Sequence, residues 1–223
     1  MTYIGSKPAD KVLTASDITD GVVSNAKLAQ DIISADTALG AEPADTDEFL
    51  VSDAGTLKRM DYSYIKGGIT MADQWRLTSS FTGDAVPIAS NWERNDTSPA
   101  LGYFGSAMTE SSGIFTFPST GIYYVKFHGT FSLDSNSRFD AMKIEVTEND
   151  SSYSVDAITY AHISRVDSQE TFTSADLDII LDVTDTSNIK VRFSVEHHTV
   201  GTSNSGDSTQ DGTYVRFIRL GDT

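Results

Sequence analysis

The sequence predicts an all-β protein whose C-terminal two-thirds form an antiparallel sandwich behind an extended N-terminal segment. Beyond Gly68, apolar residues alternate with polar ones at a period of two, and runs of Gly, Ser, Asn and Asp separate the alternating stretches. Long helical periods are absent there, and all but four of the aromatic residues lie in this part. Because aromatic side chains supply large buried areas, we expect the hydrophobic core within residues 70–223.

Six strands can be placed by this alternation. In the second of them, Tyr123, Val125 and Phe127 point to one face, and Tyr124 and the polar residues that alternate with them point to the other. Many short strands in about 150 residues indicate a sandwich or jelly roll. The predicted strands cover residues 114–117, 121–129, 142–146, 177–183, 189–195 and 214–220.

Residues 1–66 are poor in apolar residues, and we do not expect them to fold compactly alone. A chain of 223 residues leaves room for such an extension beside one domain. Small apolar clusters at a spacing of about five residues fit neither a regular helix nor a regular strand. The sequence nevertheless allows a short helix over Ser24–Ile33. Either this part is a disordered tail, or it buries its apolar residues against other chains. The second hypothesis makes an anchor of Ile18, Val22, Leu28 and Ile32.

The pattern of residues 47–66 predicts a small hairpin at the end of this extension. Phe49–Val51 forms one strand, Asp53–Gly55 the turn, and Leu57–Met60 the returning strand. Gly67 and Gly68 then mark a hinge before the globular part.

The composition excludes several classes of function. Asp and Glu number 32 against 16 Lys and Arg, a formal net charge of −16, which argues against binding to nucleic acid or to anionic lipid. The absence of cysteine excludes disulfides and thiolate zinc sites. No apolar run is long enough to span a bilayer, and the first residues lack the apolar run of a signal peptide. We therefore expect no nucleic acid and no membrane insertion.

A search for catalytic motifs finds none. HExxH, a glycine-rich phosphate loop and a GxSxG elbow are all missing, and no serine has an identifiable base. We predict no catalytic residue, no enzyme activity and no cofactor. His197 and His198 would point to opposite faces of a strand, so they do not suggest a shared metal ion.

Oxygen-rich loops raise the question of calcium. Carboxylates in or near these loops are either solvated, which we favour, or calcium ligands. They are Asp134, Asp140, Asp207 and Asp211.

Two polar stretches, residues 134–138 and 201–212, are candidates for variable loops that contact a ligand. Binding residues often lie on loops that a rigid scaffold holds in place. The flexible composition alone would produce the same sequence, so the prediction is open. The candidates are Ser135, Asn136, Arg138, Asn204 and Asp207.

The stretch Ser112–Phe127 resembles the signature of the complement/TNF superfamily of jelly rolls. In that family an aromatic strand ends in a Pro-containing turn, and Gly-x-Tyr and a Phe follow. The strand at Trp92 and the closing strand Gly212–Leu220 extend the resemblance to about residues 75–221. The matching residues are Gly113, Phe115, Pro118, Gly121, Tyr123 and Phe127, with Thr213, Tyr214 and Phe217 in the closing strand.

This resemblance implies a tight homotrimer. Ile122, Tyr124 and Ile180 lie on strand faces opposite the expected core, and exposed apolar groups there suggest an interface. The alternative is that they are cross-strand packing on the surface of a monomer.

The N-terminal segments DGVVSNAKLAQDIIS and DEFLVSDAGTLKRMDYSYIK resemble the N-terminal parts of tailed-phage fibre proteins. The resemblance implies a structural virion protein. Residues 1–66 would be the anchor and a short trimeric stalk on a capsid or tail protein, and residues 70–223 the head that binds a host surface glycan or protein. The alternatives are a capsid-mounted head fibre or decoration protein, or a secreted complement-like lectin.

Overall fold

The computed structural model describes residues 14–19, 38–65, 67–100 and 102–223. The chain divides into two compact units, Met1–Lys66 and Gly67–Thr223. The predicted all-β fold is confirmed: within the described ranges, the non-strand elements are two 3-10 turns, η1 (Ala15–Asp17) and η3 (Tyr62–Tyr64). No helix among these residues has the length and apolar character needed to cross a bilayer.

The first unit contains the predicted hairpin. Strand β1 (Glu48–Asp53) pairs with β2 (Thr56–Asp61) in antiparallel register. Ala54 and Gly55 form a two-residue turn with φ of +48° and +84°, the sign of both angles in a type I′ turn, whose twist matches that of paired strands. Ile18 is exposed. The other predicted anchor residues, Val22, Leu28 and Ile32, and the helix considered over 24–33 lie outside the described residues.

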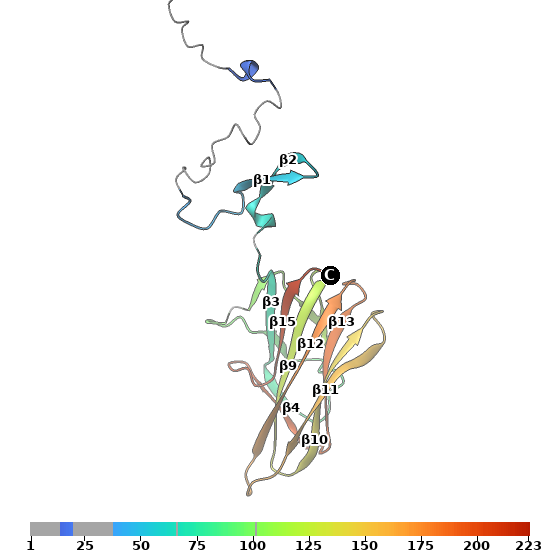
Figure 1. Cartoon of the computed structure of the whole chain (residues 1–223). Coiled ribbons are helices and arrows are strands. Elements are labelled where there is room, and N and C mark those ends of the chain that lie inside the picture. The colour runs from blue at the N-terminus through green and yellow to red at the C-terminus, as the bar shows by residue number, and fades with distance from the viewer. Residues whose placement is uncertain (1–13, 20–37, 66, 101) are drawn as a thin grey trace, which may run out of the picture. The chain divides into compact units, whose positions relative to one another are not determined.

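The second unit is a sandwich of two antiparallel sheets (Figure 1). The five-stranded sheet has the order β11-β10-β13-β8-β7. Its strands are β7 (Thr109–Ser111), β8 (Ile114–Thr116), β10 (Ser137–Thr147), β11 (Tyr153–Ile163) and β13 (Lys190–His197). The eight-stranded sheet contains β3 (Met71–Leu77), β4 (Ser79–Thr82), β5 (Trp92–Arg94), β6 (Tyr103–Gly105), β9 (Gly121–Leu133), β12 (Thr171–Val183), β14 (Ser203–Asp207) and β15 (Tyr214–Gly221).

Strand β9 organises the larger sheet. On one side it pairs with β12 over its whole length, from Gly121↔Val183 to Leu133↔Thr171. On the other side it pairs first with β15 and then with β14. All six strands that the alternation predicts are present, and the fold is the predicted jelly-roll sandwich. The strand expected at Trp92 is β5, and the structure adds β11, β14 and the short strands β3, β4, β6 and β7. Strand β14 lies within residues 201–212, so the prediction of one continuous loop there is wrong.

The core lies between the two sheets and is mainly aromatic. Phe115 has no exposed surface, and its ring contacts those of Trp75, Trp92, Phe193 and Phe217 at centroid distances of 5.3–5.6 Å. Tyr123, Val125 and Phe127 of β9 are fully buried, as the period of two predicts. The core is thus built from residues 71–217 of the second unit alone.

Two glycines of the family signature are required by the backbone. Gly113 has φ of +81°, and a Cβ atom there would lie 2.3 Å from the carbonyl oxygen of Ile88. Gly121 has φ of +143°, and its Cβ would lie 2.6 Å from the carbonyl oxygen of Gly221. A side chain is strained at both positions, so the signature glycines serve the fold.

The sandwich has two distinct ends. The chain enters through Met71, which pairs with Arg219 of the last strand, so entry and C-terminus share one end (Figure 1). The other end carries three loops, residues 134–136, 164–170 and 198–202, which we call the distal loops. They are separated from the entry by the 13 residues of β9, about 40 Å at ~3.3 Å per residue.

Candidate functional site

One candidate surface is a row of apolar residues across the outward face of the larger sheet. Ile180 of β12 pairs with Tyr124 of β9, which pairs with Ile218 of β15. Ile218 in turn pairs with Ala72 of β3, and Ala72 with Phe104 of β6. Because directly paired residues point to the same side of a sheet, these five side chains form one continuous stripe, which we call the apolar row. Its two ends are open to solvent: Ile180 is 70% exposed and Phe104 50%.

The sequence identified part of this surface. Ile122, Tyr124 and Ile180 do point away from the core, and Ile122 lies one outward position from Tyr124 on β9. Ile218 and Phe104 were missed. The alternation in β15 could have identified Ile218. Its neighbour Phe217 is fully buried, and successive residues of a strand point to opposite faces. Phe104 lies on a three-residue strand that has no readable pattern.

A polar band runs beside the apolar row, and one of its carboxylates, Asp176, is paired with a cation. The ammonium of Lys126 lies 2.6 Å from Asp176, and the Tyr124 hydroxyl donates to Asp178 at 2.8 Å. The hydrogen bond from Lys126 lowers the pKa of Asp176, and the same bond raises the pKa of Lys126. Burial, followed by the hydrogen bond to Asp178, raises the pKa of Tyr124. An apolar stripe with a polar border has the composition of a protein interface.

A second candidate surface lies at the distal end. Ser135, Asn136 and Arg138 are all exposed there. Ser135 and Asn136 lie in a loop as predicted, whereas Arg138 lies at the start of β10, so the predicted loop 134–138 is shorter than expected. The Asn136 side-chain oxygen accepts the backbone N–H of Arg165 at 2.7 Å, and the Asn136 carbonyl accepts the Thr199 hydroxyl at 2.9 Å. Asn136 therefore ties the three distal loops together and positions their neighbouring side chains.

A hollow of about 340 Å³ lies beside Asn136. It brings together Arg138, His162 and His198, which come from three different segments of the chain. The rest of its lining is Asn136, Ser137, Ile163 and Ser164. Sequence reasoning selected Arg138 but had no signal for the two histidines, because their proximity results from the pairing of β10 with both β11 and β13.

Asn204 does not belong to this surface. It is fully buried; its Nδ2 donates to the carbonyl of Gly83 at 3.1 Å, and its Oδ1 lies 3.2 Å from Nε2 of His197. The other ring nitrogen of His197 lies 2.9 Å from Asp140, which is also fully buried, within β10. The prediction of Asn204 as a ligand residue is therefore wrong, because its polar atoms are used inside the protein.

The loop after β14, residues 208–213, does not lie among the distal loops. Its start is fixed by Asp207, whose carboxylate accepts the backbone N–H groups of Thr209 at 2.6 Å and Gln210 at 3.2 Å. The Thr209 hydroxyl bond and these backbone bonds lower the pKa of Asp207. Its end lies beside β9 three residues before that strand ends, where the Thr130 hydroxyl donates to the Gly212 carbonyl. Asp207 is exposed, but it is separated from Arg138 and the other candidates.

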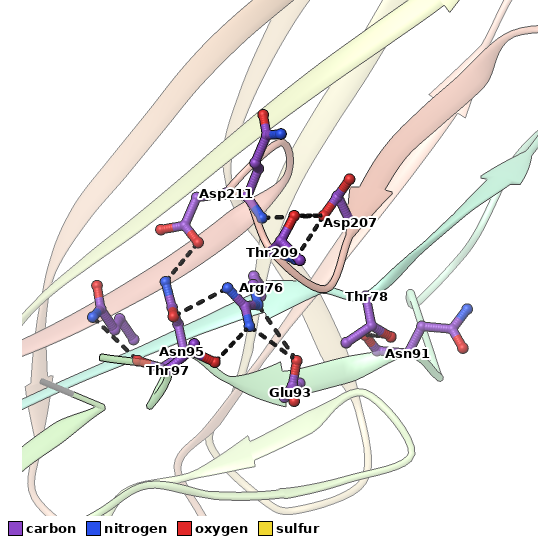
Figure 2. Close-up of polar contacts among 11 residues, drawn as sticks. Arg76, Thr78, Asn91, Glu93, Asn95, Thr97, Asp207, Thr209 and Asp211 are labelled. Atoms are coloured by element: carbon purple, nitrogen blue, oxygen red, sulfur yellow. Dashed lines mark hydrogen bonds and ion pairs between the residues drawn. The ribbon is translucent and has the colours of Figure 1, made fainter. Parts of the chain in front are cut away.

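The same loop is held by a buried arginine, as Figure 2 shows. The guanidinium of Arg76 donates to Glu93, to Asn95 at 3.1 Å and to Thr97 at 3.3 Å. Asn95 donates in turn to Asp211 at 2.7 Å. This network joins β3, the segment after β5 and the loop after β14, so its polar groups stabilise the fold.

A metal ion finds no evident site in the part of the chain that is described. Those residues contain no group of three or more His, Cys, Asp or Glu side chains that could hold one. Three of the four candidate calcium carboxylates are used elsewhere: Asp140 contacts His197, Asp207 caps its turn and Asp211 accepts from Asn95. The fourth, Asp134, is exposed on a distal loop.

Comparison with known proteins identifies the fold. No protein-family model matches the chain, and no curated protein sequence does. The solved structure of Eiger TNF from S. frugiperda is similar, with a TM-score of 0.50 at 11% identity over 70% of this chain and 96% of that one. Murine APRIL at pH 5.0 gives a TM-score of 0.46 at 10% identity, over 67% of this chain and 98% of that one. The likeness to Eiger TNF shows a shared TNF-like jelly-roll fold.

Proposed function

We propose that the chain is a non-enzymatic, homotrimeric fibre protein of a tailed-phage virion that attaches to the host surface through its jelly roll. The observation that carries this proposal is the apolar row, which crosses the sheet from Phe104 to Ile180 beside the ion pair of Lys126 and Asp176. A partly exposed apolar stripe of this kind does not stabilise a monomer, whereas three copies can bury it around a common axis.

The apolar row must overcome the repulsion between like-charged chains. Each chain has a formal net charge of −16, so assembly brings three strongly acidic molecules together. Burial of the row supplies the attraction, and pairing of Lys126 with Asp176 reduces the unpaired charge beside it. The resulting trimer carries three copies of the distal loops. Three weak contacts on one rigid body bind a surface with an avidity that exceeds any single contact.

The role proposed for residues 1–66 is attachment to the virion. The resemblance of this segment to phage fibre N-termini supports it, and the short hairpin β1-β2 would continue the chain toward the head. Purified capsids and purified tails, each tested for binding to the full chain, separate the two mounting sites. Binding to capsids alone would indicate a head fibre or decoration protein, and binding to neither would overturn the anchor.

The mass in solution tests the assembly directly. Light scattering on the full chain and on residues 70–223 should give a trimer for both, because the apolar row lies within the jelly roll. If the full chain is a trimer and residues 70–223 are a monomer, the N-terminal unit drives the assembly. Monomers of both would overturn the proposal.

A further inference from the structure

The distribution of paired and unpaired cations in the second unit is uneven. Of its ten lysines and arginines, eight contact a carboxylate. The remaining two are Arg138 and Arg165, for which the described residues provide no ion pair. They lie at the distal end, in a unit with 21 Asp and Glu residues. The paired residues are Arg76, Arg94, Lys126, Lys143, Lys190, Arg192, Arg216 and Arg219.

The unpaired arginines belong to segments that are bonded to each other. The N–H of Arg165 donates to Asn136, two residues before Arg138 in the chain. Arg138 lines the 340 Å³ hollow with His162 and His198, and its lining contains no Asp or Glu. The hollow therefore offers a guanidinium fork and imidazole groups without a competing internal anion, which suits an external carboxylate.

Two carboxylates of the distal end line a different hollow. Asp134 and Glu170 line a separate hollow with Ser132, Ser168 and Gly201, among others. Glu170 already accepts a hydrogen bond from the Ser132 hydroxyl, at 2.6 Å. One of these two hollows is therefore acidic and the other basic, and the exposed Asp167, two residues after Arg165, lines neither of them.

An aromatic surface adjoins the basic hollow. Tyr160 lies two residues before His162 on β11, so the two side chains share a face, and Tyr160 is 62% exposed. The ring of Phe139 stands edge-on to Tyr160 at 6.1 Å and contacts the ring of His198 at 5.7 Å. Phe139 thus connects the hollow to an open tyrosine ring, which can pack against the C–H face of a sugar.

We propose that the distal hollow binds an acidic saccharide, one whose sugar carries a carboxylate. Arg138 forms the bidentate contact with the carboxylate, and Arg165 adds a second positive charge. His162 and His198 hydrogen-bond the carboxylate and neighbouring hydroxyls, and Tyr160 packs on the adjacent ring. This inference rests on the proposed adhesive function and names the class of host ligand for the distal loops. It also explains why a strongly acidic protein keeps two arginines unpaired at the end farthest from the chain entry.

Calorimetric titration of the full chain tests the site. The acidic probes are sialyllactose and tetragalacturonate, and the neutral probe is lactose. We expect binding of an acidic probe and none of lactose at the same concentration. Arg138→Gln should weaken binding at least about tenfold, since it removes a charge-assisted contact. Arg59→Gln, the same change at an exposed arginine of the first unit, should leave binding within about twofold of the wild type.

Two further measurements decide the chemistry. Tyr160→Ala should weaken saccharide binding and leave any binding of inorganic phosphate unchanged, because phosphate has no C–H face to pack. Equal binding of acidic and neutral probes, or no effect of Arg138→Gln, would overturn the inference. So would phosphate binding as tight as that of the saccharides with no effect of Tyr160→Ala. Arg138 is exposed and unpaired, so an unchanged melting temperature should confirm that the variant folds.

Host-cell binding separates this inference from the proposed function. Cells that bind the full chain without competition from either acidic probe would contradict the saccharide site and leave the adhesion proposal standing. If the chain binds an acidic probe specifically but is monomeric and does not bind cells, the saccharide site stands and the adhesion proposal is contradicted.

Discussion

Replacement of Ile180 by aspartate should dissociate the proposed trimer while leaving the jelly roll folded. Ile180 lies on β12 with its side chain directed away from the core, and 70% of it is exposed in the single chain. The outward positions next to it on the strand are Asp176, Asp178 and Asp182. The substitution therefore removes the apolar group between acidic residues and completes a run of four outward carboxylates.

The size of the effect follows from the exposed fraction. Full burial of an isoleucine is worth about 1.5–3 kcal/mol, so the 70% that is still exposed leaves about 1–2 kcal/mol for each chain to gain on assembly. Three equivalent positions give about 3–6 kcal/mol per trimer, a factor of roughly 10²–10⁴ in its dissociation constant. The added carboxylates increase this loss, because an unpaired charge is costly to bury.

Light scattering over a range of protein concentrations measures the shift, and circular dichroism checks the fold. Val200→Asp is the matched control, since Val200 is 82% exposed on a distal loop, away from the apolar row. We expect monomers of Ile180→Asp where the wild type and the control are trimers. If Ile180→Asp stays trimeric at every concentration, the apolar row is not the interface and the reasoning is refuted.

Three further predictions concern stability. Phe115→Ala should cost about 3–5 kcal/mol in urea unfolding because it empties the centre of the aromatic core, whereas Phe172→Ala, at a position 62% exposed, should cost under about 1 kcal/mol; similar costs would contradict the packing described. Gly113→Ala should lower the urea midpoint clearly and Gly221→Ala hardly at all, because only the first Cβ meets backbone; equal midpoints would argue against the tight turn. The folded-state pKa of Asp176 lies below its ordinary value of 3.8, so its stabilisation is complete above that value and is lost as the pH falls through the folded pKa. Between about pH 5 and about pH 3 the wild type should therefore lose more stability than Asp176→Asn, and parallel losses would contradict the ion pair.

The alternation of apolar residues was sufficient to predict the main strands, because each buries one face against the core. Strand β9 follows this rule from Gly121 to Phe131 without interruption. Strand β11 escaped prediction for a physical reason: its pairing with β10 contains an irregularity between the pairs Ile144↔Ala157 and Glu145↔Val155, which shifts the period of two. Strand β11 is also an edge strand, and it carries apolar or aromatic residues such as Tyr160 on its solvent face. Its sequence therefore does not alternate clearly between apolar and polar residues.

The candidate site was less accessible to sequence reasoning, because its residues are brought together by long-range pairing. Asn204 and Asn136 both lie in polar stretches, yet one is buried against His197 and the other is exposed and bonds the distal loops together. Composition does not distinguish the two. Likewise, Arg138 meets His162 and His198 only after β10 has paired with strands on both of its sides.

The separation of the chain entry from the distal loops determines how the jelly roll would respond to mechanical force. Tension between Met71 and a ligand at the distal loops runs parallel to the strands, and β3 is the first strand to be loaded. Six consecutive residue pairs join β3 to β15, from Met71↔Arg219 to Arg76↔Tyr214. Antiparallel hydrogen bonds are perpendicular to the strands, so such a pull shears them all at once and does not unzip them one after another. If the domain held a particle in flowing liquid, the force would therefore act parallel to the strands. That is the direction in which the domain resists mechanical unfolding most.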